Sequence, residues 1–582
     1  MSRARCSLLA IALVCLTAPS VGAQAVAVQG PFPGGPGGGR RGGGMRDRPD
    51  MPTGTATLRG RVVGGESGGP LRRAVVRLQG QEMREGKMTT TDEQGRWELK
   101  DLPAGRFTLT ATKAGYVTLQ YGQRRPFEQG RPLDIQDNQT LNNVNFNLPR
   151  GSVIAGRIND EFGEPVADAS VMALRYRYFN GQRRLIPAGR WSQSDDGGNF
   201  RIYGLAPGDY YLSATLRDGM FFGGGESTSR SGYAATYFPG TPSEQQAEKV
   251  SVGVGSEVTG ISFALLPVRT ARITGTAVDS QGKPLTGAFV SIVETSGDGG
   301  TFMMSFGGGN RVSENGHFTL TDVSPGEYTL TAREMGPGRA GEDSETAETK
   351  IIVSGEDISG VSLIGTKGGS IKGQVSFDTQ QPGSIKPGSV SVVVMPKDPL
   401  GSAGFFFGPG NRDTLNDDWT FEMRAMKGPV LLRTMRTPPG YTLKAVYFNN
   451  QDVTDSGVNF KPGESISGVQ VVLTAKSSTV SGSVTDARSQ PATDYAAIIF
   501  AEDSAKWGFM SRFVHMARPD QQGAFQVKDL PPGRYLAAAV DYLEEGEETN
   551  PETLERLRNS ATPFALEEGD TKTLALKVVT QY

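Results

Sequence analysis

A short pattern centred on glycine recurs five times along the 582-residue chain and limits what the chain can fold into. In each copy, apolar residues stand two positions before and two positions after the glycine, as in Ile273-Thr274-Gly275-Thr276-Ala277. The five glycines are Gly60, Gly156, Gly275, Gly373 and Gly482, and neighbouring copies lie 96 to 119 residues apart. This spacing is the length of a small domain, so the pattern predicts five domains in tandem.

A second pattern lies further along each copy. An aromatic residue is followed by a glycine eight positions later in copies one, two, three and five, and seven positions later in copy four. The pairs are Trp97 and Gly105, Phe200 and Gly208, Phe318 and Gly326, Phe421 and Gly428, and Phe525 and Gly533. Each copy then closes with alternating apolar and polar residues, as in Val144-Asn145-Phe146-Asn147-Leu148. Period-two alternation between turn signals is typical of antiparallel β-sandwiches.

We therefore predict an all-β chain: a tandem array of five seven-stranded antiparallel β-sandwich domains. The expected domain boundaries are 56–149, 150–268, 269–366, 367–476 and 477–582. The last domain also has a helical signal near 551–560, because Asn550 can cap a helix and Pro551 suits its first turn. Few residues separate consecutive copies, so we expect limited bending between the domains.

The N-terminus has the pattern of a secretory signal peptide over residues 1–23. Arg3 and Arg5 precede an apolar run over 8–17, and Val21-Gly22-Ala23 forms a small-residue cleavage site. Cys6 and Cys15, the two cysteines of the chain, would leave with it. We therefore expect an exported protein that is periplasmic, outer-membrane-associated or extracellular. No later segment is apolar enough over sufficient length to predict a transmembrane span.

Residues 24–55 predict a disordered linker rich in Gly, Pro and Arg. The stretch 30–54 holds ten Gly and five Pro and almost nothing apolar, so no core can offset the entropy cost of ordering it. Its arginines suit a tether to anionic surface material, and its composition equally suits a plain spacer.

The repeats resemble the carboxypeptidase regulatory-like domain. The third copy carries the resemblance most fully, through Gly275, Asp279, Gly282, Pro284, Ala288, Val290, Gly316, Phe318, Pro325, Gly326 and Tyr328. The fourth copy departs from the family at the Pro turn and at the final aromatic residue. The resemblance implies a transthyretin-like, prealbumin-like sandwich related to starch-binding folds. It also implies a non-catalytic accessory role beside peptidases, outer-membrane receptors or surface proteins, and some relatives of the fold bind carbohydrate.

The residue types needed for common catalytic sites are scarce. The two histidines, His317 and His515, lack the His-x-x-Glu spacing of a zinc peptidase, and no Gly-x-Ser-x-Gly motif accompanies them. The run Asp195-Asp196-Gly197-Gly198-Asn199 lacks the spacing of a calcium loop and reads as a hairpin turn. We predict that the protein is not an enzyme and uses no cofactor or metal. A hydrolase with paired carboxylates stays open as an alternative.

Large apolar residues recur after the first long strand of the later copies, where we expect loops. The candidates for contact with a ligand or partner are Tyr176 and Tyr178, Phe302 and Met303, Phe405 and Phe406, and Trp507 and Phe509. Exposed apolar loops mark binding surfaces, although the same residues could pack against a neighbouring domain. Trp97 aligns with core phenylalanines and is expected to be buried. The tyrosines, Trp507 and Phe509 suit stacking on sugars, whereas Phe405 and Phe406 suit a protein or membrane surface.

These observations predict an exported, non-catalytic binding or scaffold protein, with carbohydrate binding at the cell envelope as its working hypothesis. The expected partner is a polysaccharide or an envelope protein. A nucleic acid is not expected, because 60 Lys and Arg nearly balance 62 Asp and Glu. The alternative in the same class is a periplasmic accessory of an outer-membrane transporter or peptidase.

Overall fold

The structure of the protein is a computed structural model in which Met51–Tyr582 forms one compact unit. The described residues are 54–80, 83, 86–179, 182–216, 231–294, 304–305, 311–333, 345–367, 369–379, 385–397, 412–425, 428–461, 463–508 and 510–579. The predicted signal peptide (1–23) and nearly all of the predicted linker (24–55) lie outside them. Five large hydrophobic cores follow one another along these residues, which confirms the prediction of an all-β tandem of sandwiches.

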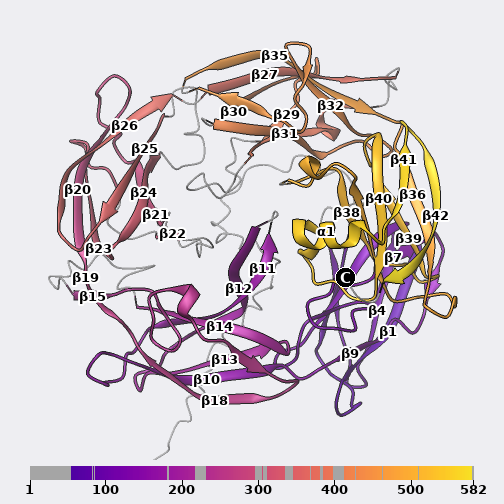
Figure 1. Ribbon diagram of the computed structural model, residues 1–582, viewed down its shortest axis with the longest axis horizontal. Coiled ribbons are helices and arrows are strands. Elements are labelled where there is room, and N and C mark those ends of the chain that lie inside the picture. Colours follow the sequence, from indigo (N-terminus) through magenta and orange to yellow (C-terminus); the bar gives the residue numbers. More distant parts are fainter. Residues whose placement is uncertain are drawn as a thin grey trace, which may run out of the picture. The chain divides into compact units, whose positions relative to one another are not determined.

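The first two cores are built from the following elements (Figure 1). The first sandwich contains β1 (Ala56–Gly64), β2 (Val75–Gly80), β3 (Lys87–Thr90), β4 (Arg96–Leu102), β5 (Gly105–Thr112), β6 (Leu119–Gln120), β7 (Leu133–Ile135), β8 (Thr140–Leu141) and β9 (Phe146–Leu148). The second contains β10 (Ser152–Asn159), β11 (Ser170–Phe179), β12 (Gln182–Gln193), β13 (Asn199–Leu205), β14 (Gly208–Thr215), β15 (Ser231–Tyr233), β16 (Thr236–Tyr237), η1 (Glu244–Gln246), β17 (Val250–Val252), β18 (Glu257–Ala264) and β19 (Pro267–Arg269).

The other three cores follow the same plan. The third sandwich contains β20 (Ala271–Val278), β21 (Phe289–Glu294), β22 (Met304–Ser305), β23 (His317–Val323), β24 (Gly326–Arg333), β25 (Glu345–Val353) and β26 (Ile358–Lys367). The fourth contains β27 (Gly369–Phe377), η2 (Pro387–Ser389), β28 (Ser391–Pro396), β29 (Arg412–Thr414), β30 (Thr420–Ala425), β31 (Gly428–Arg436), β32 (Thr442–Phe448), β33 (Gln451–Asp452), β34 (Val458–Phe460) and β35 (Ser465–Thr474). The fifth contains β36 (Thr479–Thr485), β37 (Ala496–Ala501), η4 (Ser504–Lys506), β38 (Val514–Ala517), β39 (Ala524–Lys528), β40 (Gly533–Val540), η5 (Glu547–Thr549), α1 (Pro551–Arg558), β41 (Thr562–Leu566) and β42 (Thr571–Val579).

The first and last strands of every copy pair in parallel, which the sequence patterns did not indicate. The pairs are β1 with β9, β10 with β18, β20 with β26, β27 with β35, and β36 with β42. Most other pairs are antiparallel, as expected. Helix α1 packs on the fifth core through Leu554 and Leu557, and its N-cap Asn550 accepts a hydrogen bond from the amide of Glu552. Among the described residues, no helix has the length and apolar character needed to cross a membrane.

The recurring glycine lies where the closing strand crosses closest to the opening strand. A Cβ at each of the five positions would stand less than 3.0 Å from a backbone carbonyl oxygen of the partner segment, a distance real Cβ atoms essentially never show; the oxygens belong to Val144, Ile261, Val361, Val469 and Leu574. In four copies the aromatic ring of the second pattern crowds the same space; these rings are Trp97, Phe318, Phe421 and Phe525. The recurring glycine and the recurring aromatic residue therefore result from the same close contact between the opening and closing strands.

Gly373→Ala should destabilise the fourth sandwich, because its Cβ would overlap both the Phe421 ring and the Val469 carbonyl. We expect a loss of about 1–3 kcal/mol in the free energy of unfolding, as for other overpacked cores. Gly388→Ala, in η2 of the same sandwich, is the matched control, since no atom lies within 4 Å of its added Cβ. Chemical denaturation measures both, and equal stability of the two variants would contradict this account of the pattern.

The fifth sandwich contacts the first through a buried ion-pair cluster. Arg518 Nη2 lies 3.1 Å from Glu128 Oε1 and 2.7 Å from Asp494 Oδ1, and the side chains of Arg518 and Glu128 are only 2% and 1% exposed. The amide of Arg124 also donates to Glu128. Around this cluster, the Tyr542 hydroxyl donates to the Pro126 carbonyl at 2.9 Å. Two segments about 390 residues apart in the sequence are thus held together.

The same region holds the hairpin of β11 and β12. The guanidinium of Arg175 lies 3.3 Å from the centre of the Phe127 ring and pairs with Glu544 at 3.3 Å. Arg177 pairs with Glu545 at 3.2 Å. The amide of Glu545 in turn donates to the Phe127 carbonyl. Through these side chains, β11 contacts both the first and the fifth sandwiches.

Glu128→Ala should lower the free energy of unfolding, because it removes one carboxylate partner of the buried Arg518 guanidinium. We expect a loss of about 3 kcal/mol or more, the usual effect of breaking a buried pair from one side. Glu98→Ala, in the same sandwich, removes the partner of Arg59 from a solvent-exposed pair and should change stability little. Thermal unfolding measures both. Equal melting temperatures would show that the Arg518 cluster does not hold these segments together.

Candidate binding surface

Three of the eight predicted contact residues can be placed. Tyr176, Tyr178 and Trp507 belong to the part of the chain that the structure describes, whereas Phe302, Met303, Phe405, Phe406 and Phe509 lie outside the described residues. The three placed residues do not come together in one site. Two lie on the second sandwich and one lies in the core of the fifth.

The prediction that Trp507 lies on an exposed binding loop is wrong. Its side chain is buried, at 5% exposure, and its indole Nε1 donates to the Ala501 carbonyl at 2.8 Å. Its ring meets Phe500 edge-on, and the guanidinium of Arg558 from α1 lies 5.2 Å from its centre. The 3₁₀ turn η4 folds the chain back at this point, so Trp507 fills its own sandwich. The alternative of packing on a neighbouring domain is not what the contacts show either.

Tyr176 and Tyr178 lie on a strand, which corrects the expectation of a loop. Strand β11 continues past the length seen in other copies and pairs with β12 from Ser170↔Gln193 to Phe179↔Gln182. Arginine and tyrosine alternate over 175–178, which is the pattern of a strand. The sequence analysis interpreted these residues as part of a loop. Both tyrosines are half-buried on the side of the sheet that faces away from the main core.

This outer face of the sheet β12-β11-β14-β16 has a small apolar cluster of its own. Leu174, Leu185 and Tyr237 are buried there, with Met172, Tyr176, Tyr211 and Ala247 packed against them. Tyr176 meets Tyr211 edge-on at 5.2 Å between ring centres, and the guanidinium of Arg183 lies 4.1 Å over the Tyr176 ring. We call the face formed by Met172, Tyr176, Tyr178, Arg183, Trp191 and Tyr211 the aromatic face.

Trp191 is the residue of this face that sequence reasoning missed. It lies on β12 directly opposite Met172, and 63% of its surface is exposed. The pairing of β12 with β11 is interrupted between Pro187 and Trp191, and the exposed indole forgoes the burial that would stabilise it. Its ring is therefore available for contact with another molecule. Comparing the repeats did not indicate Trp191, because the described parts of the equivalent strands β3, β22, β29 and β38 contain no Trp, Tyr or Phe. The sequence signal that could have identified Trp191 is its position in a hairpin that contains five arginines.

Carboxylates lie near the two tyrosines of the aromatic face. Burial raises the pKa of Tyr176, and Glu244 of η1 adds to the rise. Burial also raises the pKa of Tyr178, with Glu552 and Glu547 of the fifth sandwich adding to it. Both hydroxyls therefore stay protonated at neutral pH and can act as hydrogen-bond donors.

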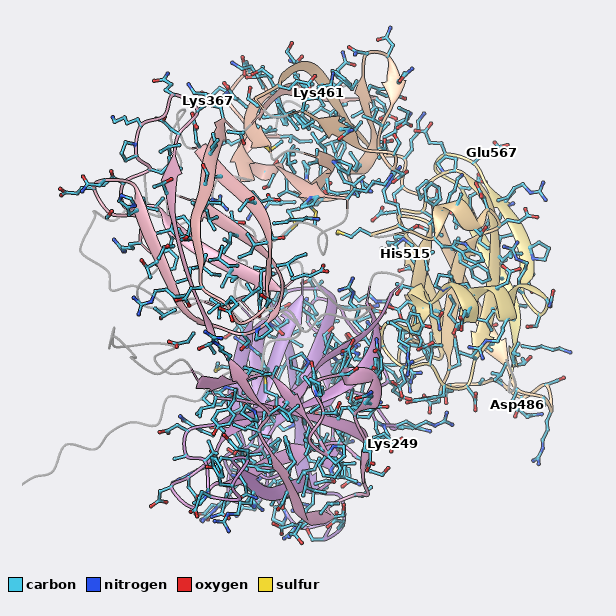
Figure 2. All side chains as sticks on the ribbon, turned by 60° about the vertical axis from the view of Figure 1, so that its left-hand side comes forward. Lys249, Lys367, Lys461, Asp486, His515 and Glu567 are labelled. Atoms are coloured by element: carbon cyan, nitrogen blue, oxygen red, sulfur yellow. The ribbon has the colours of Figure 1, made fainter. Side chains whose placement is uncertain are left out.

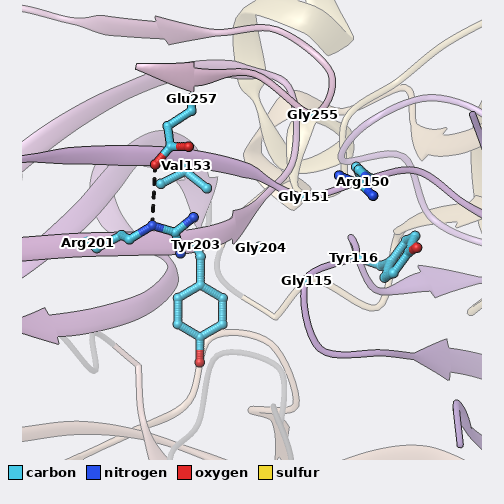
Figure 3. A pocket seen from close by; sticks show the side chains of 10 residues that line it. All are labelled: Gly115, Tyr116, Arg150, Gly151, Val153, Arg201, Tyr203, Gly204, Gly255 and Glu257. Atoms are coloured by element: carbon cyan, nitrogen blue, oxygen red, sulfur yellow. Dashed lines mark hydrogen bonds and ion pairs between the residues drawn. The ribbon is translucent and has the colours of Figure 1, made fainter. Parts of the chain in front are cut away.

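Two shallow clefts lie elsewhere. One of about 360 Å³ lies between the first and second sandwiches, with Tyr116 and Arg150 on one side and Arg201, Tyr203 and Glu257 on the other (Figure 3). The Arg201 Nε lies 3.4 Å from Glu257 Oε1, so that charge is already matched. The other, of about 400 Å³, lies on the fourth sandwich beside the Lys372–Glu422 ion pair. Both are open and polar, and neither brings together groups for catalysis.

The histidines and the acidic turn have structural roles. His515 on β38 (Figure 2) hydrogen-bonds through Nε2 with the Arg512 carbonyl at 3.2 Å, and burial lowers its pKa. His317 is exposed at the start of β23. Asp195 Oδ1 accepts hydrogen bonds from the amides of Gly197 and Asn199, which is the turn chemistry expected there. Within the described ranges, no three His, Cys, Asp or Glu side chains gather as a metal site would require.

Comparison with known proteins assigns a family to two segments. The model of the carboxypeptidase regulatory-like domain matches residues 57–149 and 272–349. The matched segments lie in the first and third sandwiches. The resemblance noted in the sequence is thus confirmed, with the family match limited to these two segments. No curated protein matches the chain.

Several solved structures show distant likeness. The TIE protein of Bacillus anthracis matches at 12% identity over 73% of this chain and 73% of its own, with a TM-score of 0.15. A streptococcal ancillary pilin matches at 12% identity over 53% of this chain and 98% of its own, and the minor pilin of Streptococcus agalactiae at 14% over 36% and 95%; both have TM-scores of 0.20. Likenesses at this level do not bear on function.

Replacing Trp507 and Trp191 in separate variants distinguishes a core residue from a surface residue. Trp507→Ala should cost about 3–5 kcal/mol, as core aromatic truncations do. Trp191→Ala should leave the unfolding free energy nearly unchanged, because most of its ring already faces water. Chemical denaturation of both variants measures the difference. A large destabilisation by Trp191→Ala would mean that its ring is buried in solution.

Proposed function

We propose that the protein is an exported, non-catalytic scaffold that binds carbohydrate of the cell envelope on the aromatic face of its second sandwich. The observation that carries this proposal is Trp191, a largely exposed indole on the edge strand β12, opposite Met172 and next to a break in the pairing of β12 with β11. Rigid exposed aromatic rings offer contact area at low entropy cost, which suits recognition better than a mobile loop does.

The chemistry of the aromatic face suits a sugar. An indole plane stacks on the apolar face of a pyranose ring, while protein hydroxyl and guanidinium groups hydrogen-bond to the sugar's polar edges. Tyr176, Tyr211 and Arg183 supply such groups beside the buried cluster of Leu174 and Leu185. The face therefore combines apolar contact with polar donors, as ligand sites do.

Two further observations support a scaffold that is exported and not catalytic. The pattern over residues 1–23 is that of a secretory signal. Residues 57–149 and 272–349 match the carboxypeptidase regulatory-like domain, a resemblance that implies an accessory role. The buried contacts of Arg518 and Arg175 hold three sandwiches together, which keeps the aromatic face in a constant position.

A glycan array followed by titration calorimetry tests the proposal on the full mature chain. Trp191→Ala should weaken binding of the array's best ligand about tenfold or more, since a stacked ring contributes on the order of 1.4 kcal/mol. Phe162→Ala is the matched control, because Phe162 is 83% exposed on the same sandwich but lies in the turn after β10.

Two results would count against the proposal. Binding that is unchanged in Trp191→Ala would place the ligand elsewhere on the molecule. No binding to any glycan, combined with capture of a single envelope protein that Trp191→Ala abolishes, would replace the carbohydrate by a protein partner on the same face.

A further inference from the structure

The hairpin that builds the aromatic face has an unusual charge composition. Between Asp168 and Asp195 the chain has five arginines and no Asp, Glu or Lys; the arginines are Arg175, Arg177, Arg183, Arg184 and Arg190. The whole chain is nearly neutral, with 60 basic and 62 acidic residues, so the excess is local. A local excess of one charge on a binding element selects ligands of the opposite charge.

The five arginines are used in different ways. Arg175 and Arg177 pair with Glu544 and Glu545 and fix the hairpin to the fifth sandwich. Arg184 also has a partner. Arg183 lies over the Tyr176 ring, and Arg190 lies 5.7 Å over the Tyr203 ring. Neither of these two forms an ion pair with a carboxylate among the residues that the structure describes.

A guanidinium stacked on an aromatic ring keeps its edge free. Its N–H groups point outward in the guanidinium plane, where they can hold a carboxylate by two parallel hydrogen bonds. The ring beneath restricts the arginine to few rotamers, so binding costs less ordering entropy. Arg183 on Tyr176 is therefore a ready receptor for one anionic group.

The register places Arg183 and Trp191 on the same face of the hairpin. Arg183 is opposite Tyr178 and Trp191 is opposite Met172, six residues apart on β11. At about 3.3 Å per residue this is about 20 Å, which a single sugar ring cannot bridge. A ligand that contacts both residues is a chain of several units.

We infer that the ligand of the aromatic face is an acidic polysaccharide, whose carboxylate binds Arg183 and whose sugar ring stacks on Trp191. This inference rests on the proposed function and narrows its ligand class. Glu244 near Tyr176, and Glu547 and Glu552 near Tyr178, add negative charge beside this face, so anionic groups of a ligand bind where a guanidinium is free. A carboxylated polysaccharide supplies both a carboxylate for Arg183 and an apolar sugar face for Trp191.

Titration of the full mature chain with alginate, dextran and single-stranded DNA tests the inference. Alginate carries carboxylates and dextran is neutral, so alginate should bind at least tenfold more tightly, with an affinity that falls as salt rises. Arg183→Gln should weaken alginate binding about 10- to 100-fold, the usual effect of losing a charged hydrogen-bond pair, and should weaken dextran binding much less, because a neutral sugar loses no ion pair. Arg183→Lys, which keeps the charge without the fork, should recover only part of the loss.

Arg157→Gln is the matched control, since Arg157 is exposed on β10 of the same sandwich and away from the hairpin. Equal melting temperatures of all variants confirm that each is folded.

Loss of dextran binding in Trp191→Ala, together with no effect of Arg183→Gln on alginate binding, would overturn this inference and leave the proposed function standing. Alginate binding that neither Trp191→Ala nor Arg183→Gln weakens would contradict both this inference and the proposed function. Binding of DNA as tight as that of alginate would overturn the acidic-polysaccharide assignment, and binding of dextran sulfate in place of alginate would identify sulfate as the anionic group.

Discussion

The close approach of the closing strand to the opening strand is the constraint on which each sandwich depends. A backbone carbonyl of the last strand occupies the space where a Cβ would stand on the first strand, so only glycine fits. The strands can then pair in parallel, as β20 and β26 do, and the two sheets close around the aromatic ring beneath. Because this arrangement uses backbone geometry more than side-chain identity, the rest of each copy is free to vary in sequence.

That freedom shows in the second sandwich. Its hairpin extends β11 and β12 well beyond the pairing that the core needs, and the extra length carries the aromatic face on one side and Arg175 and Arg177 on the other. A long two-stranded projection is only marginally stable alone. Here its edge is supported by Glu544 and Glu545 of the fifth sandwich and by the ring of Phe127. The contacts between sandwiches therefore also make the aromatic face a fixed surface.

The fold could be predicted because its causes are local and repeated. Gly275 and Phe318 mark one close contact, and a glycine with an aromatic ring marks it in three other copies. Parallel closure could not be inferred, since alternation with period two is the same in parallel and antiparallel strands. The burial of Trp507 also escaped sequence reasoning. A short 3₁₀ turn returns it to the core, and its hydrogen bond to Ala501 exists only in the folded chain.

The candidate site illustrates a limit of reasoning from repeats. A comparison of the copies identifies the residue types that they share, and these shared residues stabilise the fold. Trp191 and Arg183 have no counterparts in the other sandwiches, so the comparison left them out, while it grouped Tyr176 with apolar residues that do something different. Trp191 departs from the repeat and is largely exposed, so its side chain contributes little to the stability of the fold and its ring is available for contact with another molecule.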